Sequence, residues 1–373
     1  MKFAGSATKE GTEHYRNRFE GKLPPAHFHP SQGLWLSSIG IGTYLGNHDS
    51  ETDRLYQDAV VRAVESGCNV IDTAINYRFQ RSERSIGAAL RDLATRGFQR
   101  EEIVVATKGG FIPYDSEPPK DVRSYFDETF DRPGIARVSD VIAGCHCMTP
   151  KYLLNQLDCS LRNLNLECVD IYYVHNPEMQ LGKISRPEFN DRLLQAFAAL
   201  EGAVSAGKIG FYGTATWNGY RNEPTAKDYL SIADVVELAT KAGGKSHHFK
   251  FIQLPLNLGM TEALSLTNQS IQGKQLTLLQ AVQALGLTVM CSASILQGQL
   301  TRSLPSVIGE TFESLETDGQ RAIQFVRSSP GVTTALVGMK QIAHVEENLK
   351  TAQVPPASWE QYSKLFQASE SNE

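Results

Sequence analysis

The sequence lacks the features of several broad protein classes. No apolar run is long enough to span a bilayer, and the first residues lack the apolar stretch of a secretion signal. Glu10, Glu13 and Glu20 in the same stretch argue against a transit peptide. A net charge of -5 provides no basic excess, so neither nucleic acid nor an anionic membrane is an expected partner. These absences favour a cytoplasmic protein.

Cysteine is also scarce. Six cysteines in 373 residues do not make a disulfide framework. Four of them lie in or beside apolar runs and are expected to be small buried hydrophobes: Cys68, Cys159, Cys168 and Cys291. The cluster Cys145-His146-Cys147 has residue types that bind zinc, but no fourth ligand is evident nearby. Buried or loop thiols are the favoured interpretation, and no metal is expected.

The chain does contain a regular alternation of short apolar runs and amphipathic stretches. Strand-like runs occupy 34–44, 69–74, 103–109, 169–175, 208–216, 249–257, 287–294 and 332–338. Helical patterns lie at 51–67, 82–93, 149–164, 189–207, 226–242, 277–285 and 319–329, and a last helix begins near Gln341. Strands that are apolar without strict alternation are typical of a parallel sheet covered on both faces. Eight such repeats predict an α/β fold, the (β/α)8 TIM barrel.

The pattern predicts a single domain with two additions at its ends. Residues 1–33, which are polar and then rich in proline and histidine, are expected to form an N-terminal extension that wraps around the domain or is partly disordered. The barrel is assigned to 34–355 and a C-terminal tail to 356–373. The irregular segment 109–148 forms a long loop after the third strand and is expected over the barrel mouth.

The aromatic residues of this long loop have two open interpretations. They form the wall of a substrate pocket, or they pack against neighbouring loops. The residues in question are Phe111, Tyr114, Tyr125, Phe126 and Phe130.

Polar residues gather at the ends of the predicted strands, where enzymes with this barrel build their sites. Asp72, Lys108 and His175 end three consecutive strands, and Tyr77 follows the first of them. Singly, each has an ordinary interpretation as a cap, a surface residue or a strand end. A carboxylate, an amine and an imidazole at three successive strand ends together indicate a site. Further polar residues at or beside later strand ends are Thr214, Thr216, Gln253, Asn257, Ser292 and Ser294.

Several stretches resemble motifs of one family. NVIDTAINYRFQRSERSIGAAL resembles the Asp-Thr-Ala-x-x-Tyr motif of the aldo-keto reductase superfamily. VVATKGG resembles the segment that carries the family lysine, and LDCSLRNLNLECVDIYYVHNP the helix and strand that lead to the family histidine. IQLPLN and ALVGMKQIAHVEENL resemble the nicotinamide and adenosine segments. The resemblance covers roughly residues 35 to 350.

This resemblance implies an NADP(H)-dependent enzyme that reduces an aldehyde or ketone to an alcohol, or runs the reverse oxidation. The family's general acid falls on Tyr77, and Lys108, Asp72 and His175 complete the catalytic tetrad. A free phenol, with a pKa of about 10, is a poor acid at neutral pH, and a nearby ammonium makes it a better donor. Asp72 is expected to orient Lys108, and His175 to donate a hydrogen bond to the carbonyl oxygen.

The resemblance also implies a set of cofactor-binding residues. Gln253 falls on the residue that holds the nicotinamide carboxamide, and Glu347 with Asn348 on the adenine contacts. Lys340 and His344 lie where a cation pairs with a 2′-phosphate, which favours NADP(H) over NAD(H). No Gly-x-Gly-x-x-Gly follows the first strand, which disfavours an open dinucleotide-binding sheet. The remaining expected cofactor-binding residues are Gly42, Thr43, Tyr44, Thr216, Ser292 and Gly338.

The sequence departs from the family pattern in four ways, of which the long segment 109–148 is one. Ala215 and Thr216 replace the common Ser-Asn after strand five, and Ser292 replaces an aromatic residue after strand seven. Arg78 stands where glycine is common. It lies on the surface or reaches an anionic substrate or a cofactor phosphate, and the surface position is favoured.

Two rival functions stay open. A nicotinamide-binding regulatory subunit would sense the cofactor state, and a metal-dependent barrel hydrolase or lyase would need a metal. The complete tetrad favours the reductase.

Overall fold

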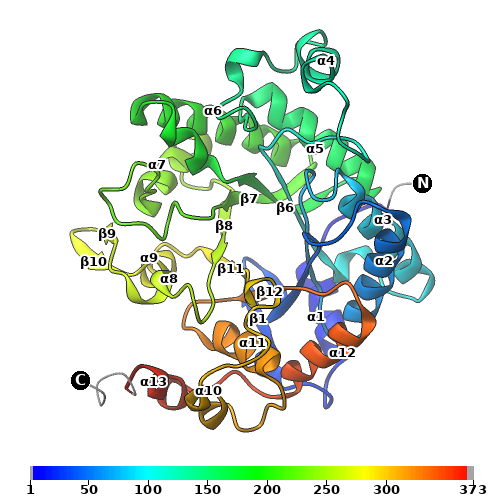
Figure 1. The fold of residues 1–373 in the computed structure, drawn as a ribbon, viewed down its shortest axis with the longest axis vertical. Coiled ribbons are helices and arrows are strands. Elements are labelled where there is room, and N and C mark those ends of the chain that lie inside the picture. The colour runs from blue at the N-terminus through cyan, green and yellow to red at the C-terminus, as the bar shows by residue number, and fades with distance from the viewer. Residues whose placement is uncertain (1–2, 368–373) are drawn as a thin grey trace.

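The computed structural model describes residues 3–367 and contains a closed barrel of eight parallel strands (Figure 1). Around the barrel the order is β3-β4-β5-β6-β7-β8-β11-β12, and β12 pairs with β3 to close the ring. The strands are β3 (Ile39–Gly42), β4 (Val70–Asp72), β5 (Val104–Gly109), β6 (Val169–His175), β7 (Ile209–Ala215), β8 (Phe249–Pro255), β11 (Thr288–Ser292) and β12 (Thr334–Gly338). The predicted α/β barrel is confirmed.

One long helix follows each barrel strand, and these helices surround the strands in Figure 1. They are α2 (Ser50–Glu65), α3 (Arg81–Thr95), α5 (Pro150–Leu164), α6 (Arg186–Ser205), α7 (Ile232–Gly243), α9 (Leu278–Ala284), α11 (Asp318–Ser328) and α12 (Ile342–Leu349). The other helices are α1 (Lys9–Asn17), α4 (Val122–Phe126), α8 (Glu262–Ser265), α10 (Ser306–Thr311) and α13 (Trp359–Gln367). None of the helices in residues 3–367 is long and apolar enough to cross a membrane.

Local sequence signals set the starts of several of these helices. The Asp49 side chain accepts the backbone N–H of Thr52 and caps α2. Capping boxes open α9 at Thr277 and Gln280 and α11 at Thr317 and Gln320. Each of these residues satisfies a backbone donor that the helix itself leaves free, so the helices begin where the sequence patterns place them.

The apolar run 34–44 is not the single strand that its composition predicts. It divides into β2 (Leu34–Ser37), which pairs antiparallel with β1 (Phe28–Ser31), and the barrel strand β3. Leu34 and Leu36 pack with the first residues of β4 and β5 in the barrel interior, so the hairpin closes the amino-terminal end of the barrel. The expected boundary after residue 33 runs through the turn of this hairpin.

The remaining part of the N-terminal extension also packs against the barrel. The hydroxyl of Tyr15 in α1 donates to the carbonyl oxygen of Val64, and Arg18 pairs with the buried Glu102. Over residues 3–33 the extension therefore follows the first of its two interpretations, a wrapping segment. A short hairpin of β9 (Gln269–Ile271) and β10 (Lys274–Leu276) is inserted between β8 and β11.

The C-terminal tail begins with a packed helix. Tyr362 of α13 is buried, its ring stacks on Phe325 with centroids 5.3 Å apart, and its hydroxyl bonds to Ser329. This helix therefore covers the outside of α11. The rest of the predicted tail, 368–373, lies outside the described residues.

Candidate active site

Strand register brings the predicted catalytic residues to one end of the barrel. Asp72 ends β4, Lys108 is the penultimate residue of β5, and His175 ends β6. These strands are neighbours in the ring, and all three side chains are buried. Tyr77, on the turn after β4, is partly exposed. The carboxyl end of the barrel is therefore the candidate site, as the positions of the polar residues predict.

The Lys108 ammonium is held by two short hydrogen bonds. Its Nζ donates to Asp72 Oδ2 at 2.7 Å and to the carbonyl oxygen of Thr73 at 2.7 Å. Burial lowers the pKa of Lys108, while the Asp72 carboxylate acts in the opposite direction. The same Nζ lies 4.9 Å from the centroid of the Tyr77 ring. The structure thus brings Asp72, Lys108 and Tyr77 together.

Tyr77 lies between two other aromatic rings. Its ring meets Tyr44 edge-on at 4.9 Å and His175 at 5.9 Å between centroids. Its pKa is raised well above the usual value, first by burial and then by the charge of Asp72 and by Tyr44. The phenol therefore carries its proton at neutral pH, and it gives that proton up only to a strongly basic oxygen nearby.

His175 is a neutral imidazole. Burial, then the positive charge of Lys108 and then His146, hold the pKa of His175 well below its usual value. Its Nδ1 atom is buried without a hydrogen-bond partner. A neutral imidazole with an unpaired ring nitrogen has capacity to bind a polar ligand atom at the mouth.

His146, from the Cys145-His146-Cys147 cluster, forms a hydrogen bond with the backbone of His175. Its Nε2 donates to the carbonyl oxygen of His175 at 2.6 Å, and its Nδ1 accepts from the Gln180 side chain at 3.1 Å. A Cβ on Gly110, whose φ is +144°, would lie 2.8 Å from His146 Nε2, so this approach requires glycine. Because both ring nitrogens are engaged, the cluster offers no imidazole to zinc. Residues 3–367 contain no group of three or more side chains able to hold a metal.

Gln253 makes a contact that sequence reasoning missed. Its Nε2 donates to Asp72 Oδ1 at 2.7 Å, so both oxygens of this carboxylate are bonded. The two residues are 181 positions apart, and no local pattern signals the pairing. Gln253, expected to hold a nicotinamide carboxamide, thus also belongs to the hydrogen-bond network of the tetrad.

The other residues expected around the nicotinamide differ in their surroundings. Thr216 Oγ1 is buried without a partner, and Ser292, at the end of β11, is partly exposed. The Thr43 hydroxyl is instead bonded to Thr73 and to the carbonyl oxygen of Asp72. Orphaned polar atoms at Thr216 and His175 in one barrel mouth fit a polar ring substituent such as a carboxamide. The side chains of Thr214, Asn257 and Ser294 are bonded within the protein.

The residues expected around the adenosine half lie on and before α12. Gln341 provides no side-chain cap, which leaves the first N–H groups of this helix without a side-chain acceptor. A Cβ on Gly46 would lie 3.7 Å from Lys340 Nζ, so the lysine borders the loop after β3. An uncapped helix start beside an ammonium fits a phosphate-bearing nucleotide. Gly42 and Gly338 are paired in register, His344 is exposed, Glu347 is half-buried and Asn348 is buried.

The expected surface position of Arg78 is wrong. Its side chain is 1% exposed, and its guanidinium bonds to Asp53 at 2.6 Å and to the carbonyl oxygen of Asn47 at 2.7 Å. Asp53 lies on α2, and Arg81 pairs with the same carboxylate. Asp53 therefore pairs with both Arg78 and Arg81, and Arg78 fastens the loop after β3 to α2.

The aromatic residues of the long loop after β5 divide between the candidate site and a small core. Phe111 meets His175 edge-on at 4.8 Å between centroids and His146 at 5.5 Å. Phe126 and Phe130 instead form a small core with Tyr152 of α5. A cavity of about 420 Å³ adjoins the site through Asn176, which follows His175, and is bordered by Trp217. Phe111, through its contact with His175, and Trp217, through the cavity, are therefore candidates for contacts with a substrate.

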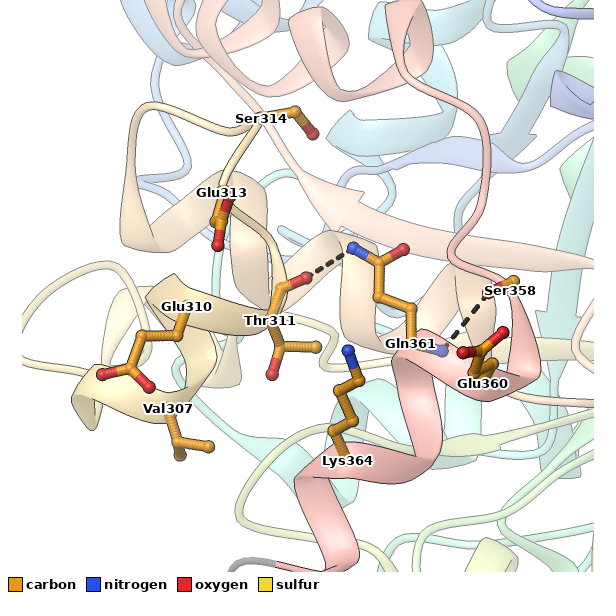
Figure 2. A pocket seen from close by; sticks show the side chains of 9 residues that line it. All are labelled: Val307, Glu310, Thr311, Glu313, Ser314, Ser358, Glu360, Gln361 and Lys364. Carbon is orange, nitrogen blue, oxygen red and sulfur yellow. Dashed lines mark hydrogen bonds between the residues drawn. The ribbon is translucent and has the colours of Figure 1, made fainter.

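A larger cavity of about 930 Å³ is separate from this site. It lies between α10 and α13, and Figure 2 shows Lys364 directed toward the space between them. Gln361 of α13 donates to the carbonyl oxygen of Thr311 of α10 and bridges the two helices. None of the predicted site residues lines this cavity.

Known protein structures share this fold. An aldo/keto reductase of Klebsiella pneumoniae in complex with NADP and acetate aligns with a TM-score of 0.59 and 20% identity, covering 91% of this chain and 93% of that one. The holo form of an aldo-keto reductase of Bacillus halodurans also gives a TM-score of 0.59 at 20% identity, with 91% and 94% coverage. At this identity the likeness concerns the fold.

Sequence relatives include proteins with different named roles. A protein of Schizosaccharomyces pombe named as a voltage-gated potassium channel subunit beta is 24% identical over 348 residues, which is 90% of each chain. The NADH-specific methylglyoxal reductase of Escherichia coli is 29% identical over 187 residues, 49% of each chain. The sequence model of the Aldo/keto reductase family matches residues 38–370. This match spans the barrel and the tetrad, and the chain belongs to the Aldo/keto reductase family.

Proposed function

We propose that this protein is an NADP(H)-dependent oxidoreductase that reduces an aldehyde or ketone to an alcohol, with Tyr77 as the general acid. The observation that carries the proposal is the buried Lys108–Asp72 pair at 2.7 Å, with the ammonium 4.9 Å from the Tyr77 ring. The orphaned polar atoms of Thr216 and His175 and the uncapped start of α12 beside Lys340 support a dinucleotide as the cofactor.

When bound, NADPH would supply a hydride to the carbonyl carbon of the substrate, and the electron pair of the C=O bond would pass to oxygen. Tyr77 donates its proton to this oxygen, which is basic enough to take it although burial raises the pKa of the phenol. The Lys108 ammonium stabilises the phenolate that remains, and Asp72 keeps the ammonium in place. His175, neutral because its pKa is lowered, donates a hydrogen bond that fixes the substrate oxygen.

The side chain of Lys340 would balance the negative charge of a 2′-phosphate, and this is the basis for preferring NADP(H). His344, which follows Lys340 in the sequence, is exposed on the first turn of α12. Phe111 and Trp217 would contact the part of the substrate beyond the carbonyl group.

Replacing Tyr77 by phenylalanine tests the proposal. The change removes only the hydroxyl, so NADPH affinity should persist while the rate of carbonyl reduction falls by about 10²–10⁴-fold, the usual contribution of a general acid. NADPH oxidation with a panel of aldehydes and quinones measures turnover, and fluorescence titration measures cofactor binding. Tyr125→Phe is the matched control, because that hydroxyl bonds to the carbonyl oxygen of Pro113 within the long loop. Turnover retained by Tyr77→Phe would remove the acid assignment.

A second candidate function is a nicotinamide-binding regulatory subunit with little turnover. It is favoured by three relatives named as channel beta subunits, whose alignments cover 90%, 87% and 87% of this chain. The complete tetrad favours the reductase instead. Wild-type protein that binds NADPH and oxidises it with none of the carbonyl compounds in the panel would support the regulatory subunit.

A further inference from the structure

The hydrogen bond between Gln253 and Asp72 spans the barrel. Gln253 belongs to β8 and Asp72 to β4, which lie four strands apart in the ring of eight and therefore on opposite sides. Their side chains nevertheless meet at 2.7 Å, and both residues are buried, at 4% and 5% exposure. The contact is thus a bridge across the floor of the candidate active site.

The bridge completes the hydrogen bonding of Asp72. Lys108 occupies Oδ2 and Gln253 occupies Oδ1, each at 2.7 Å. A carboxylate bonded on both sides has its plane fixed, and that plane sets the direction in which Oδ2 meets the ammonium. Without Gln253, Oδ1 would be a buried charged oxygen that must turn to find another donor.

We propose that Gln253 is a positioning residue that couples cofactor binding to the Asp72–Lys108 pair. The inference rests on the proposed function for its cofactor. A glutamine amide has two donor hydrogens and one acceptor oxygen. One hydrogen is used by Asp72, which leaves the other hydrogen and Oε1 for an amide-bearing ligand. Gln253 is thereby able to hold a nicotinamide carboxamide and Asp72 at the same time, and a bound cofactor would stabilise the orientation of the tetrad.

Two substitutions separate this role from cofactor binding alone. Gln253→Met keeps the side-chain length and removes both polar atoms. A pure cofactor ligand would show a raised NADPH KM and an unchanged kcat at saturating NADPH. A positioning residue would also lower kcat at saturation, by ~10²-fold for an ångström-scale displacement of the tetrad. An unchanged kcat at saturating NADPH would overturn the proposal.

Gln253→Glu gives a readout that needs no cofactor. It places a second carboxylate against Asp72, and two buried like charges raise the pKa of one of them. The folded state then binds a proton that the unfolded chain has released above a pKa of about 4.3, so stability should fall as pH rises from about 5 to 8. Urea unfolding of the cofactor-free protein measures this slope.

Gln324→Glu is the matched control for burial alone. Gln324 is 2% exposed, and its amide donates to the carbonyl oxygen of Pro355. The slope for Gln253→Glu should exceed that of the control because only Gln253 faces a carboxylate. Equal slopes would overturn the contact with Asp72. If wild-type protein neither binds nor oxidises NADPH while the two slopes differ, the proposed function fails but the hydrogen bond between Gln253 and Asp72 is supported. If Gln253→Glu does not fold, the kcat of Gln253→Met decides the proposal.

Discussion

At the scale of single residues, the site keeps two titratable groups neutral. Burial raises the pKa of the Tyr77 phenol and lowers that of the His175 imidazole, so both are uncharged around neutral pH. The charges in the same mouth belong to Lys108 and Asp72, which neutralise each other. A neutral acid and a neutral hydrogen-bond donor beside a compensated ion pair are suited to protonating an oxygen that gains charge only during the reaction.

These two shifts predict that neither His175 nor Tyr77 bends the pH profile of carbonyl reduction near neutral pH. His175 is neutral above its lowered pKa, so the acid limb should lie well below pH 6.5. Tyr77 is protonated below its raised pKa, so no alkaline limb from this phenol should appear below about pH 10. The measurement is kcat from NADPH oxidation between roughly pH 5.5 and 9. A His175→Asn variant, which has no imidazole at this position, should be slower with the same flat shape; a wild-type inflection near pH 6.5 that this variant lacks would contradict the neutral His175.

At the scale of elements, periodicity predicts the eight strands and eight helices because each has one continuous pattern of burial. It fails at 34–44, where the apolar residues of β2 and β3 follow each other without a polar break although they enter different sheets. Periodicity also does not reveal contacts between side chains that are distant in the sequence. Arg78 is buried because Asp53 lies on α2, and Gln253 reaches Asp72 across the barrel.

The contacts of two phenylalanines in the long loop after β5 predict different effects of their substitution. Phe111 contacts His175, whereas Phe126 is buried in the small core with Phe130. Phe111→Ala should change the KM for bulky carbonyl compounds by about tenfold, since a lost aromatic contact of 1–1.5 kcal/mol corresponds to that factor. Phe126→Ala should instead destabilise the protein by about 3–5 kcal/mol or unfold the loop. Steady-state kinetics and urea unfolding of both variants test this, and the reverse pattern would show that the two rings are wrongly assigned.

At the scale of the whole molecule, buried neutral histidines destabilise the protein in acid, while the raised pKa values of buried Glu83 and Glu178 act in the opposite direction. His27, bonded to Ser38 and Gly67 beneath the barrel, has its pKa lowered to about 3, mainly by burial. Burial likewise lowers the pKa of His146 to about 4 and that of His175. Below the unfolded-state pKa of about 6.5, these histidines bind protons in the unfolded chain but not in the folded protein, so stability should decrease as pH falls.

The expected loss is about 1.4 kcal/mol per pH unit for each of these histidines between roughly pH 6 and 5, where most carboxylates are still ionised. Urea unfolding at successive pH values measures it. His27→Gln should reduce the slope of the unfolding free energy against pH by the contribution of one proton, because a glutamine does not titrate. His27 lies at the opposite end of the barrel from the tetrad, so the substitution leaves the candidate site intact. The same substitution at exposed His344 should leave the slope unchanged. If His27→Gln keeps the full slope of the wild type, burial of a neutral imidazole at His27 does not contribute to the acid sensitivity of the protein.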